Sequence, residues 1–366
     1  MERVVAPSET PVNEAELDHL DYFRDLRDRH LTINGLRIAW RPKSPQTLDL
    51  AEKDFRQLHY FMALGRAFED RIGELFRQGL IPGTAFFGRG NEALSVGSSY
   101  ALRPKDTLVP MHRNLPSHLV RGQALEPLMA QYLGREGGIN RGREIHYADR
   151  SLNIFQLISH IGTMIPVATG AAFAAKYRGD GSAVLAMSGD GASSTGDFHE
   201  GFNFAAVQKL PLVLILENNF WAYKTPTRLQ YACKNLALRA IGYGTPGYLI
   251  DGTDVLGVYE ITREALLRAR SGEGPILIES VNSRACGHSI YDAYQDYVPK
   301  EEISAWDALD PVRLFEAKLK EEGKITEEQI SHLHARIDRE LEEAVAFAKK
   351  SPLPKGPDIL ENVYAP

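Results

Sequence analysis

The chain has 366 residues, of which 43% are hydrophobic and 25% are charged, so it is long enough to fold around a large core. Its formal net charge of −6 and the lack of a long basic run argue against a nucleic-acid partner, and no apolar stretch predicts a membrane span. The two cysteines, Cys233 and Cys286, form no CxxC pair, which argues against a zinc site or a disulfide framework. Because the acidic start matches neither a secretory signal nor a transit peptide, we expect a cytoplasmic protein.

The first 47 residues are expected to form an N-terminal arm and hairpin, which we set apart as residues 1–47. Residues 1–29 are polar and charged, and Asn34-Gly35 within 30–40 is typical of a tight hairpin turn. Residues 48–78 then repeat large apolar side chains at spacings of three and four, which predicts a helix that ends near Gly79.

From residue 85 to 282, short apolar runs alternate with helical patterns. The runs predict buried strands at 183–187, 211–216 and 275–281, and the patterns predict helices at 167–177, 198–208 and 255–270. This alternation predicts an α/β fold in which a parallel sheet carries helices on both faces. Residues 300–350 are rich in Glu and Lys and predict C-terminal helices, so one domain is expected over 48–350, followed by a tail at 351–366.

Two short polar motifs follow two of the predicted strands. Gly189-Asp190-Gly191 ends the first strand, and Asn218-Asn219 ends the next strand along the chain. Because ligands of an open parallel sheet bind beyond the carboxyl ends of its strands, we expect both motifs to line one site. The glycines let the backbone approach an anion closely, and hard oxygen atoms suit magnesium. The oxygens expected to bind the metal are those of Asp190, Asn219 and the Trp221 carbonyl.

Each motif alone is common in loops, so the alternative is a pair of ordinary turns. Their joint position at two strand ends favours a metal-bound diphosphate instead. The stretch from Gly189 to Asn219 also resembles the thiamine-diphosphate fingerprint of transketolase-like enzymes and, in detail, the alpha subunits of two-chain 2-oxo acid dehydrogenases. This resemblance runs from about residue 50 to 350. It implies a thiamine-diphosphate-binding fold with Mg²⁺ as the metal, and cofactor contacts from Gly189, Asp190, Gly191, Ala192, Asn219 and Trp221.

Other landmarks of that family occur in the same order. Arg113 stands where the family contacts the diphosphate, and His112 replaces the family's tyrosine, which implies a hydrogen bond to cofactor or substrate. Ser159 and Ile161 match positions that the family sets against the aminopyrimidine ring. His160, between them, departs from the family pattern and is assigned no role.

The loop 284–289 resembles the family segment that holds a histidine over the thiazolium ring. The resemblance implies that His288 is the catalytic residue of this chain and also contacts the cofactor. Ser289 matches a serine that mitochondrial relatives phosphorylate, and we expect it to be unmodified here. Cys286 is expected to be a partly buried thiol and not a nucleophile. Glu217 stands where many branched-chain members have arginine, and it is assigned no phosphate contact because an unpaired carboxylate repels phosphate.

The resemblance also implies that the site is incomplete in this chain. In this family, the glutamate that deprotonates the cofactor belongs to a separate beta chain, so an α2β2 assembly is implied. The chain would then catalyse oxidative decarboxylation of a 2-oxo acid and pass the acyl group to a lipoyl arm of an acyltransferase core. The stretch 142–147 favours branched-chain acids such as 2-oxoisovalerate, with pyruvate and acetoin as alternatives. Half of a split transketolase and a non-catalytic cofactor-binding scaffold are the rival functions.

Overall fold

A seven-stranded sheet forms the centre of the molecule. The computed structural model describes residues 32–33, 36–39, 48–155 and 158–361, so the predicted arm at 1–29 and the Asn34-Gly35 turn lie outside the described residues. The strand order is β1-β2-β8-β9-β5-β4-β3, and all neighbours are parallel except the β1–β2 hairpin. The strands are β1 (Thr32–Ile33), β2 (Leu36–Ala39), β3 (Thr107–Val109), β4 (Val184–Gly189), β5 (Leu212–Asn218), β8 (Gly247–Asp251) and β9 (Ile276–Val281).

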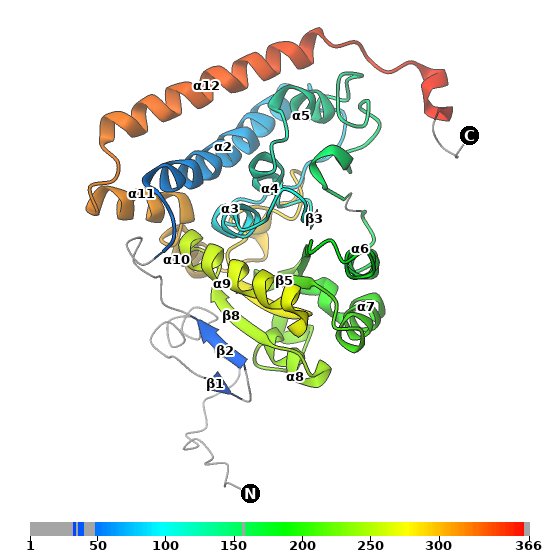
Figure 1. The fold of residues 1–366 in the computed structure, drawn as a ribbon. Helices are drawn as coiled ribbons and strands as arrows, with labels where there is room; N and C mark the ends of the chain where they lie inside the picture. The colour runs from blue at the N-terminus through cyan, green and yellow to red at the C-terminus, as the bar shows by residue number, and fades with distance from the viewer. Residues whose placement is uncertain (1–31, 34–35, 40–47, 156–157, 362–366) are drawn as a thin grey trace, which may run out of the picture.

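Helices cover both faces of this sheet (Figure 1). Helices α3 (Glu92–Tyr100) and α9 (Val255–Arg268) pack on one face, and α6 (Met164–Arg178), α7 (Gly196–Val207) and α8 (Arg239–Tyr243) pack on the other. Side chains along β4 and β5 alternate between the two buried clusters, because successive residues of a strand point to opposite faces. Both faces therefore need apolar residues, which explains the unbroken apolar runs of these two strands.

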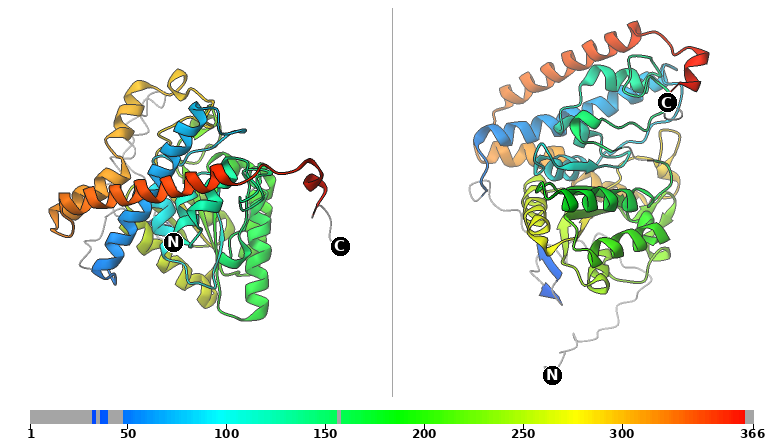
Figure 2. Two further views of the ribbon diagram at one scale, coloured as in Figure 1. Left: turned by 90° about the horizontal axis from the view of Figure 1, so that it is seen from above. Right: turned by 45° about the vertical axis from the view of Figure 1, so that its right-hand side comes forward.

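A further group of helices lies beyond the sheet, above it in the view of Figure 1. The long helices α2 (Glu52–Arg77) and α12 (Glu327–Lys350) pack with α5 (Leu125–Tyr132) around one buried cluster that includes Phe68, Leu128 and Leu341. Short α4 (Leu115–Val120) adds Leu115 and Leu119 to this cluster. Helices α10 (Lys300–Asp307) and α11 (Pro311–Glu321) complete the C-terminal part, and two further views show α12 running along the outside (Figure 2).

The predicted fold class is confirmed: a parallel sheet carries helices on both faces, and a further group of helices lies beyond it. The predicted strands at 183–187, 211–216 and 275–281 correspond to β4, β5 and β9. Strands β3 and β8 were not predicted, because their apolar runs, Leu108-Val109 and Tyr248–Ile250, are only two and three residues long. The predicted hairpin supplies the sheet edge, since β2 pairs in parallel with β8.

Four parallel strands deliver loops to the same edge of the sheet. The carboxyl ends of β3, β4, β5 and β9 are followed, respectively, by residues 110–114, 190–195, 219–223 and 282–289. These four loops carry most of the residues singled out from the sequence, and the tertiary structure brings them together although they are spread over nearly two hundred positions.

Candidate active site

The buried acid Asp190 lies directly after β4. Its side chain is 2% exposed, and Oδ2 accepts a hydrogen bond from Gln230 Nε2 at 3.1 Å. Burial raises the pKa of Asp190 to about 6, although the Gln230 hydrogen bond opposes that rise. The backbone N–H groups of Asp190 and Gly191 and the charge of Arg284 also favour the carboxylate, and a cation would offset the remaining cost of burying its charge.

The other predicted metal ligands lie after β5. Asn219 is buried, and its Oδ1 accepts a hydrogen bond from Trp221 N at 3.2 Å. The carbonyl of Trp221 accepts a hydrogen bond from Arg284 Nη1 at 3.2 Å, and a carbonyl oxygen has a second lone pair available. Gln230 Oε1 is buried without a hydrogen-bond partner in the described chain. A carboxylate, an amide oxygen and a carbonyl oxygen form a donor set that fits a hard divalent cation.

The neighbouring asparagines Asn218 and Asn219 have different environments. The Nδ2 of Asn218 donates to Glu279 Oε1 at 2.7 Å and to the hydroxyl of Tyr231 at 3.0 Å. Its Oδ1 accepts from the backbone N–H of Phe220. The side-chain amide of Asn218 is therefore held in the protein interior, whereas the side-chain oxygens of both asparagines accept the backbone N–H two residues on.

The two glycines of the first motif differ in why a side chain would not fit. A methyl group on Gly191 would lie 2.6 Å from Cβ of Ala222, which is too close for two carbon atoms that are not bonded to each other. A methyl group on Gly189 would meet nothing nearer than Sδ of Met111 at 4.0 Å. The close packing of the 190–195 loop against the 219–223 loop therefore requires glycine at position 191. At position 189 the surrounding protein leaves room for a side chain.

Arg113 and His288 are in direct contact. The guanidinium of Arg113 donates to the carbonyl of Phe87 at 2.6 Å and to the carbonyl of His288 at 2.8 Å, and Nη2 lies 3.3 Å from His288 Nδ1. The His288 ring packs edge-on against Tyr223 and Phe86. Arg113 thus joins the loop after β3 to the loop after β9.

Both histidines of this region are held neutral. Burial, with the positive charges of Arg113 and Arg284, lowers the pKa of His288 to about 4. Burial lowers the pKa of His112 to about 3, and that ring stacks on Phe86. A neutral imidazole has one donor and one acceptor nitrogen, so each ring can either give or take a hydrogen bond near neutral pH.

Ser159 and Ile161 lie at the start of the segment that leads into α6. Ile161 is 64% exposed, and His160 is also exposed. The hydroxyl of Ser159 lies 3.0 Å from Nε2 of His146, whose ring is next to the ring of His112. His146 therefore links this segment to the rest of the site, a connection that the sequence pattern did not indicate.

Glu217, to which no phosphate contact was assigned, is buried and accepts hydrogen bonds from two side-chain amides. Its oxygens accept hydrogen bonds from Nδ2 of Asn91 at 2.9 Å and from Nδ2 of Asn114 at 2.6 Å. Burial raises the pKa of Glu217 to about 7. The side chain binds the segment after β3 to the end of β5, a role that depends on three residues far apart in sequence.

Cys286 is a half-buried free thiol, as expected. Its Sγ donates to the carbonyl of Phe87, and burial raises the pKa of the thiol to about 11. A thiol that stays protonated at neutral pH is a poor nucleophile, so Cys286 acts as a packing residue. Ser289 is half-buried in the same loop, and its carbonyl accepts from the backbone N–H of Asp292.

A parallel α/β sheet with an acid, an amide, an arginine and a histidine gathered at one edge is the architecture of a cofactor-binding enzyme. The chain matches the dehydrogenase E1 component family over residues 60–356, and it belongs to that family. The predicted assignment to a 2-oxo acid dehydrogenase alpha subunit is confirmed, and membership implies thiamine diphosphate as the cofactor.

Three relatives illustrate the similarity. The chain is 35% identical to the alpha subunit of acetoin:2,6-dichlorophenolindophenol oxidoreductase from Bacillus subtilis (strain 168), over 87% of this chain and 95% of that protein. It is 36% identical to the alpha subunit of 2-oxoisovalerate dehydrogenase from the same organism, over 87% and 98%. It is 37% identical to the chloroplastic pyruvate dehydrogenase E1 component subunit alpha-3 of Oryza sativa subsp. japonica, over 84% and 75%.

These relatives differ in the substrate that their names state, while their identities to this chain are nearly equal. Similarity alone therefore does not select a substrate. Among the described residues, no helix is both long enough and apolar enough to cross a lipid bilayer.

Proposed function

We propose that this chain is the alpha subunit of an enzyme that oxidatively decarboxylates a branched-chain 2-oxo acid such as 2-oxoisovalerate, using thiamine diphosphate and Mg²⁺. The acyl group would pass to a lipoyl group on an acyltransferase partner. The observation that carries the proposal is the convergence of Asp190, Asn219, Arg113 and His288 at the carboxyl edge of one parallel sheet. We also propose a cytoplasmic location, which the two free thiols of Cys233 and Cys286 support, because a reducing compartment keeps cysteines unpaired.

The proposed roles at the diphosphate and metal follow from the donor set. Asp190, Asn219 and the Trp221 carbonyl would hold Mg²⁺, and the backbone at Gly189, Gly191 and Ala192 would approach the diphosphate. Arg113 would offer its guanidinium to a phosphate oxygen in place of one of its present carbonyl partners. When bound, thiamine diphosphate supplies the nucleophilic carbon and the electron sink for decarboxylation.

Uncharged side chains would surround the reacting part of the cofactor. His288 would hydrogen-bond the substrate carboxylate or a phosphate oxygen, and its lowered pKa keeps it uncharged for that task. His112 would contact cofactor or substrate from the opposite loop. Ser159 and Ile161 would lie against the aminopyrimidine ring, where the exposed Ile161 side chain would gain an apolar contact.

A beta subunit is proposed to complete the site in an α2β2 assembly. An exposed apolar face of α6 and α7 supports a partner on this side of the molecule: it consists of Val167, Phe173, Tyr177, Phe204 and Val207. Tyr177 is 86% exposed and Val207 is 70% exposed, and the two helices lie side by side (Figure 1). Exposed apolar side chains gathered on two adjacent helices are typical of an interaction surface. Its helix α6 begins three residues after Ile161, so a chain on this face would be near the proposed cofactor site.

Two observations support a branched-chain 2-oxo acid as the substrate. Branched-chain 2-oxo acids are favoured by the 142–147 stretch, and a relative named as a 2-oxoisovalerate dehydrogenase alpha subunit matches over 98% of its length. Pyruvate and acetoin are the alternatives, because relatives with those names match about as well.

Co-expression with a candidate beta chain tests this proposal. We expect dye reduction by the complex with 2-oxoisovalerate at a higher rate than with pyruvate or acetoin, and no turnover by either chain alone. Turnover with ketose phosphates would point to a split transketolase. Replacing the proposed metal ligand, Asp190→Ala, should abolish cofactor-dependent activity, whereas Asp338→Ala, at an exposed position of α12, should retain it. Full activity of Asp190→Ala would contradict the proposal.

A further inference from the structure

The four-residue turn 87–90 lies behind the proposed site and has little room for side chains. A methyl group on Gly88 would lie 2.0 Å from the carbonyl oxygen of Arg113. Gly90 has a φ of +93°, and a methyl group there would lie 2.1 Å from Oγ of Ser283. The backbone of this turn is therefore in direct contact with the loop after β3 and with the loop after β9.

Carbonyl groups of the turn hold both of those loops. The carbonyl of Phe87 accepts hydrogen bonds from Nη1 of Arg113 at 2.6 Å and from Sγ of Cys286 at 3.5 Å. The carbonyl of Arg89 accepts from the backbone N–H of Ala285 at 3.0 Å. The position of the turn consequently sets the position of Arg113 and of the segment that leads to His288.

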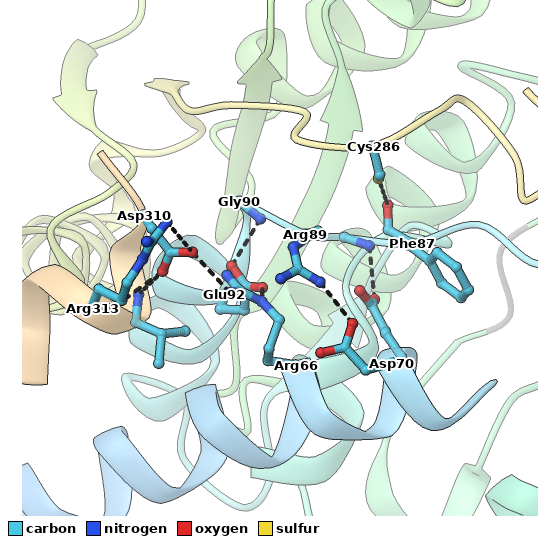
Figure 3. A network of polar contacts seen from close by, with 12 residues as sticks. Arg66, Asp70, Phe87, Arg89, Gly90, Glu92, Cys286, Asp310 and Arg313 are labelled. Atoms are coloured by element: carbon cyan, nitrogen blue, oxygen red, sulfur yellow. Dashed lines mark hydrogen bonds and ion pairs between the residues drawn. The ribbon is translucent and has the colours of Figure 1, made fainter. Parts of the chain in front are cut away.

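Two buried carboxylates hold the amide groups of the same turn from the other side. Glu69 on α2 accepts from Gly88 N at 2.7 Å, and Glu92 at the start of α3 accepts from Gly90 N at 2.9 Å. The two side chains come from separate helices, Glu69 from α2 and Glu92 from α3. Figure 3 shows Glu92 reaching Gly90. Glu69 and Glu92 are 6% and 1% exposed, so each carboxyl group is almost completely removed from water.

The second oxygen of Glu92 ties the turn to the helical layer. Arg66 Nε donates to Glu92 Oε1 at 2.5 Å, and its Nη1 donates to Asp310 at 2.8 Å. Asp310 is the N-cap residue of α11. The network in Figure 3 therefore runs from α11 through α2 to the amides of the turn.

Burying two acids so close together costs free energy. Both are nevertheless present beside Arg113 and the 284–288 loop, which the proposed function uses. Burial, with the neighbouring charge of Glu92, raises the pKa of Glu69 to about 8. Apolar side chains of similar size would avoid that cost but would leave Gly88 N and Gly90 N buried without an acceptor, so the two acids are what fixes the position of these amides.

We propose that Glu69 and Glu92 are positioning residues, which set Arg113 and the 284–288 loop for cofactor and substrate by fixing the amides of the 87–90 turn. This inference rests on the proposed function for the identity of the ligand. Neither carboxylate reaches the ligand, because the turn lies between them and the site. Arg113 can donate to a phosphate oxygen in the right direction only while the Phe87 carbonyl holds the other branch of its guanidinium.

Replacements of Glu69 provide the main test, because they distinguish the effect of side-chain size from the effect of the hydrogen bond to Gly88 N. Glu69→Met keeps the size and leaves Gly88 N without an acceptor, whereas Glu69→Gln keeps an acceptor oxygen. Glu74→Gln is the matched control: Glu74 lies on the same helix α2, is exposed and pairs with Arg71, away from the turn. In the complex with the beta chain, we expect Glu69→Met to weaken thiamine diphosphate binding by about tenfold. Glu69→Gln and Glu74→Gln should bind within about twofold of the unchanged chain.

Hydrogen exchange of the free full-length chain gives an answer that does not depend on the ligand. We expect Glu69→Met to speed exchange at 87–90 and also at 284–288, and Glu69→Gln to restore both. Unchanged exchange at 284–288 in a folded Glu69→Met chain, or unchanged cofactor affinity, would overturn the inference. If the unchanged complex binds no thiamine diphosphate, the proposed function fails, while the exchange result still decides whether the turn positions the loop.

Glu92→Gln provides the second variant if Glu69→Met does not fold. A glutamine has one acceptor oxygen for the two donors, Gly90 N and Arg66 Nε, so one hydrogen bond is lost in either orientation. The expected result is again faster exchange at 284–288 and weaker binding. Exchange and affinity equal to those of the unchanged chain would contradict the positioning role.

Discussion

At the scale of single residues, the two asparagines after β5 show how neighbours in sequence take different roles. Asn218 gives both of its amide hydrogens to Glu279 and Tyr231 inside the protein. The oxygen of Asn219 accepts the N–H of Trp221, and no hydrogen bond within the described chain ties its amide group into the interior. The sequence pattern treats the pair as one motif, whereas the contacts assign one residue to the interior and the other to the proposed metal site.

Replacing each asparagine by alanine should separate stability from binding. We expect Asn218→Ala to lower the free energy of unfolding by about 1–3 kcal/mol, because the buried Glu279 carboxyl loses a donor. Asn219→Ala should change stability little and weaken Mg²⁺-supported thiamine diphosphate binding by at least about tenfold, since changes around metal ligands alone cost roughly 10- to 100-fold. Urea denaturation and a Mg²⁺ titration measure the two effects. Equal losses of stability in both variants would contradict the division.

At the scale of elements, helix caps connect the fold to pH. Asp254 caps α9 by accepting hydrogen bonds from Leu256 N and Gly257 N, at 3.3 Å and 3.1 Å. Burial raises its pKa to about 6, with a smaller contribution from the charge of Asp251 and an opposing one from Lys318. Asp310 caps α11 in the same way, but the ion pair with Arg66 holds the pKa of that carboxyl below its usual range.

These two caps should respond to pH in opposite directions. A carboxyl group whose pKa is raised on folding contributes stability at low pH and loses it as the pH rises through about 6. Because asparagine caps helices as well as aspartate, Asp254→Asn should be more stable than the unchanged chain by on the order of 1 kcal/mol at about pH 8, with a smaller difference at about pH 5. Urea denaturation at both pH values measures this.

Asp310→Asn is the control for that experiment. A carboxyl group whose pKa is lowered on folding contributes stability above its unfolded value of about 4 and loses it as the pH falls. Asp310→Asn should therefore be less stable than the unchanged chain at about pH 8. A gain in stability for both variants at that pH would show that the raised pKa of Asp254 is not the cause.

At the scale of the whole molecule, the α6–α7 face is the clearest sign that the chain works with a partner. Two helices that bury their inner sides against the sheet also expose Phe173 and Phe204 outward, with ring centroids 6.2 Å apart. The proposed beta subunit would cover this face and bring the missing carboxylate close to Ile161.

A charge placed on this face should disrupt assembly and leave the fold of the chain intact. Val207→Glu lies at an exposed helix end, so we expect the thermal unfolding of the free chain to change little. Co-purification with the beta chain and cofactor binding should both fall strongly, because a carboxylate in an apolar interface is left unpaired. Leu353→Glu, at a position that is 64% exposed beyond α12, is the control and should assemble normally. Normal assembly of Val207→Glu would exclude this face as the interface.

The sequence predicted what depends on neighbouring residues. The apolar runs that became β4, β5 and β9 are long enough to be recognised, and the motifs at their ends are contiguous, so their place at the sheet edge followed from the fold class. The apolar runs of strands β3 and β8 are too short to be recognised, and the link from Ser159 to His146 joins segments with no shared pattern. The cofactor, metal and catalytic roles assigned to the site residues, from Arg113 and Asp190 to His288, stay predictions, as do those of His112, Ser159 and Ile161.

By itself, the sequence determined the class of fold, the family and the identity of the residues that follow the strands, because those properties reside in local runs and periodic patterns. Only the tertiary structure decided which asparagine faces inward, why Gly191 has no room for a side chain, and how Glu69 and Glu92 connect α2 and α3 to Arg113. Each of these depends on atoms within about 3 Å of each other that belong to residues far apart along the chain, and close packing brings them together only when the chain folds.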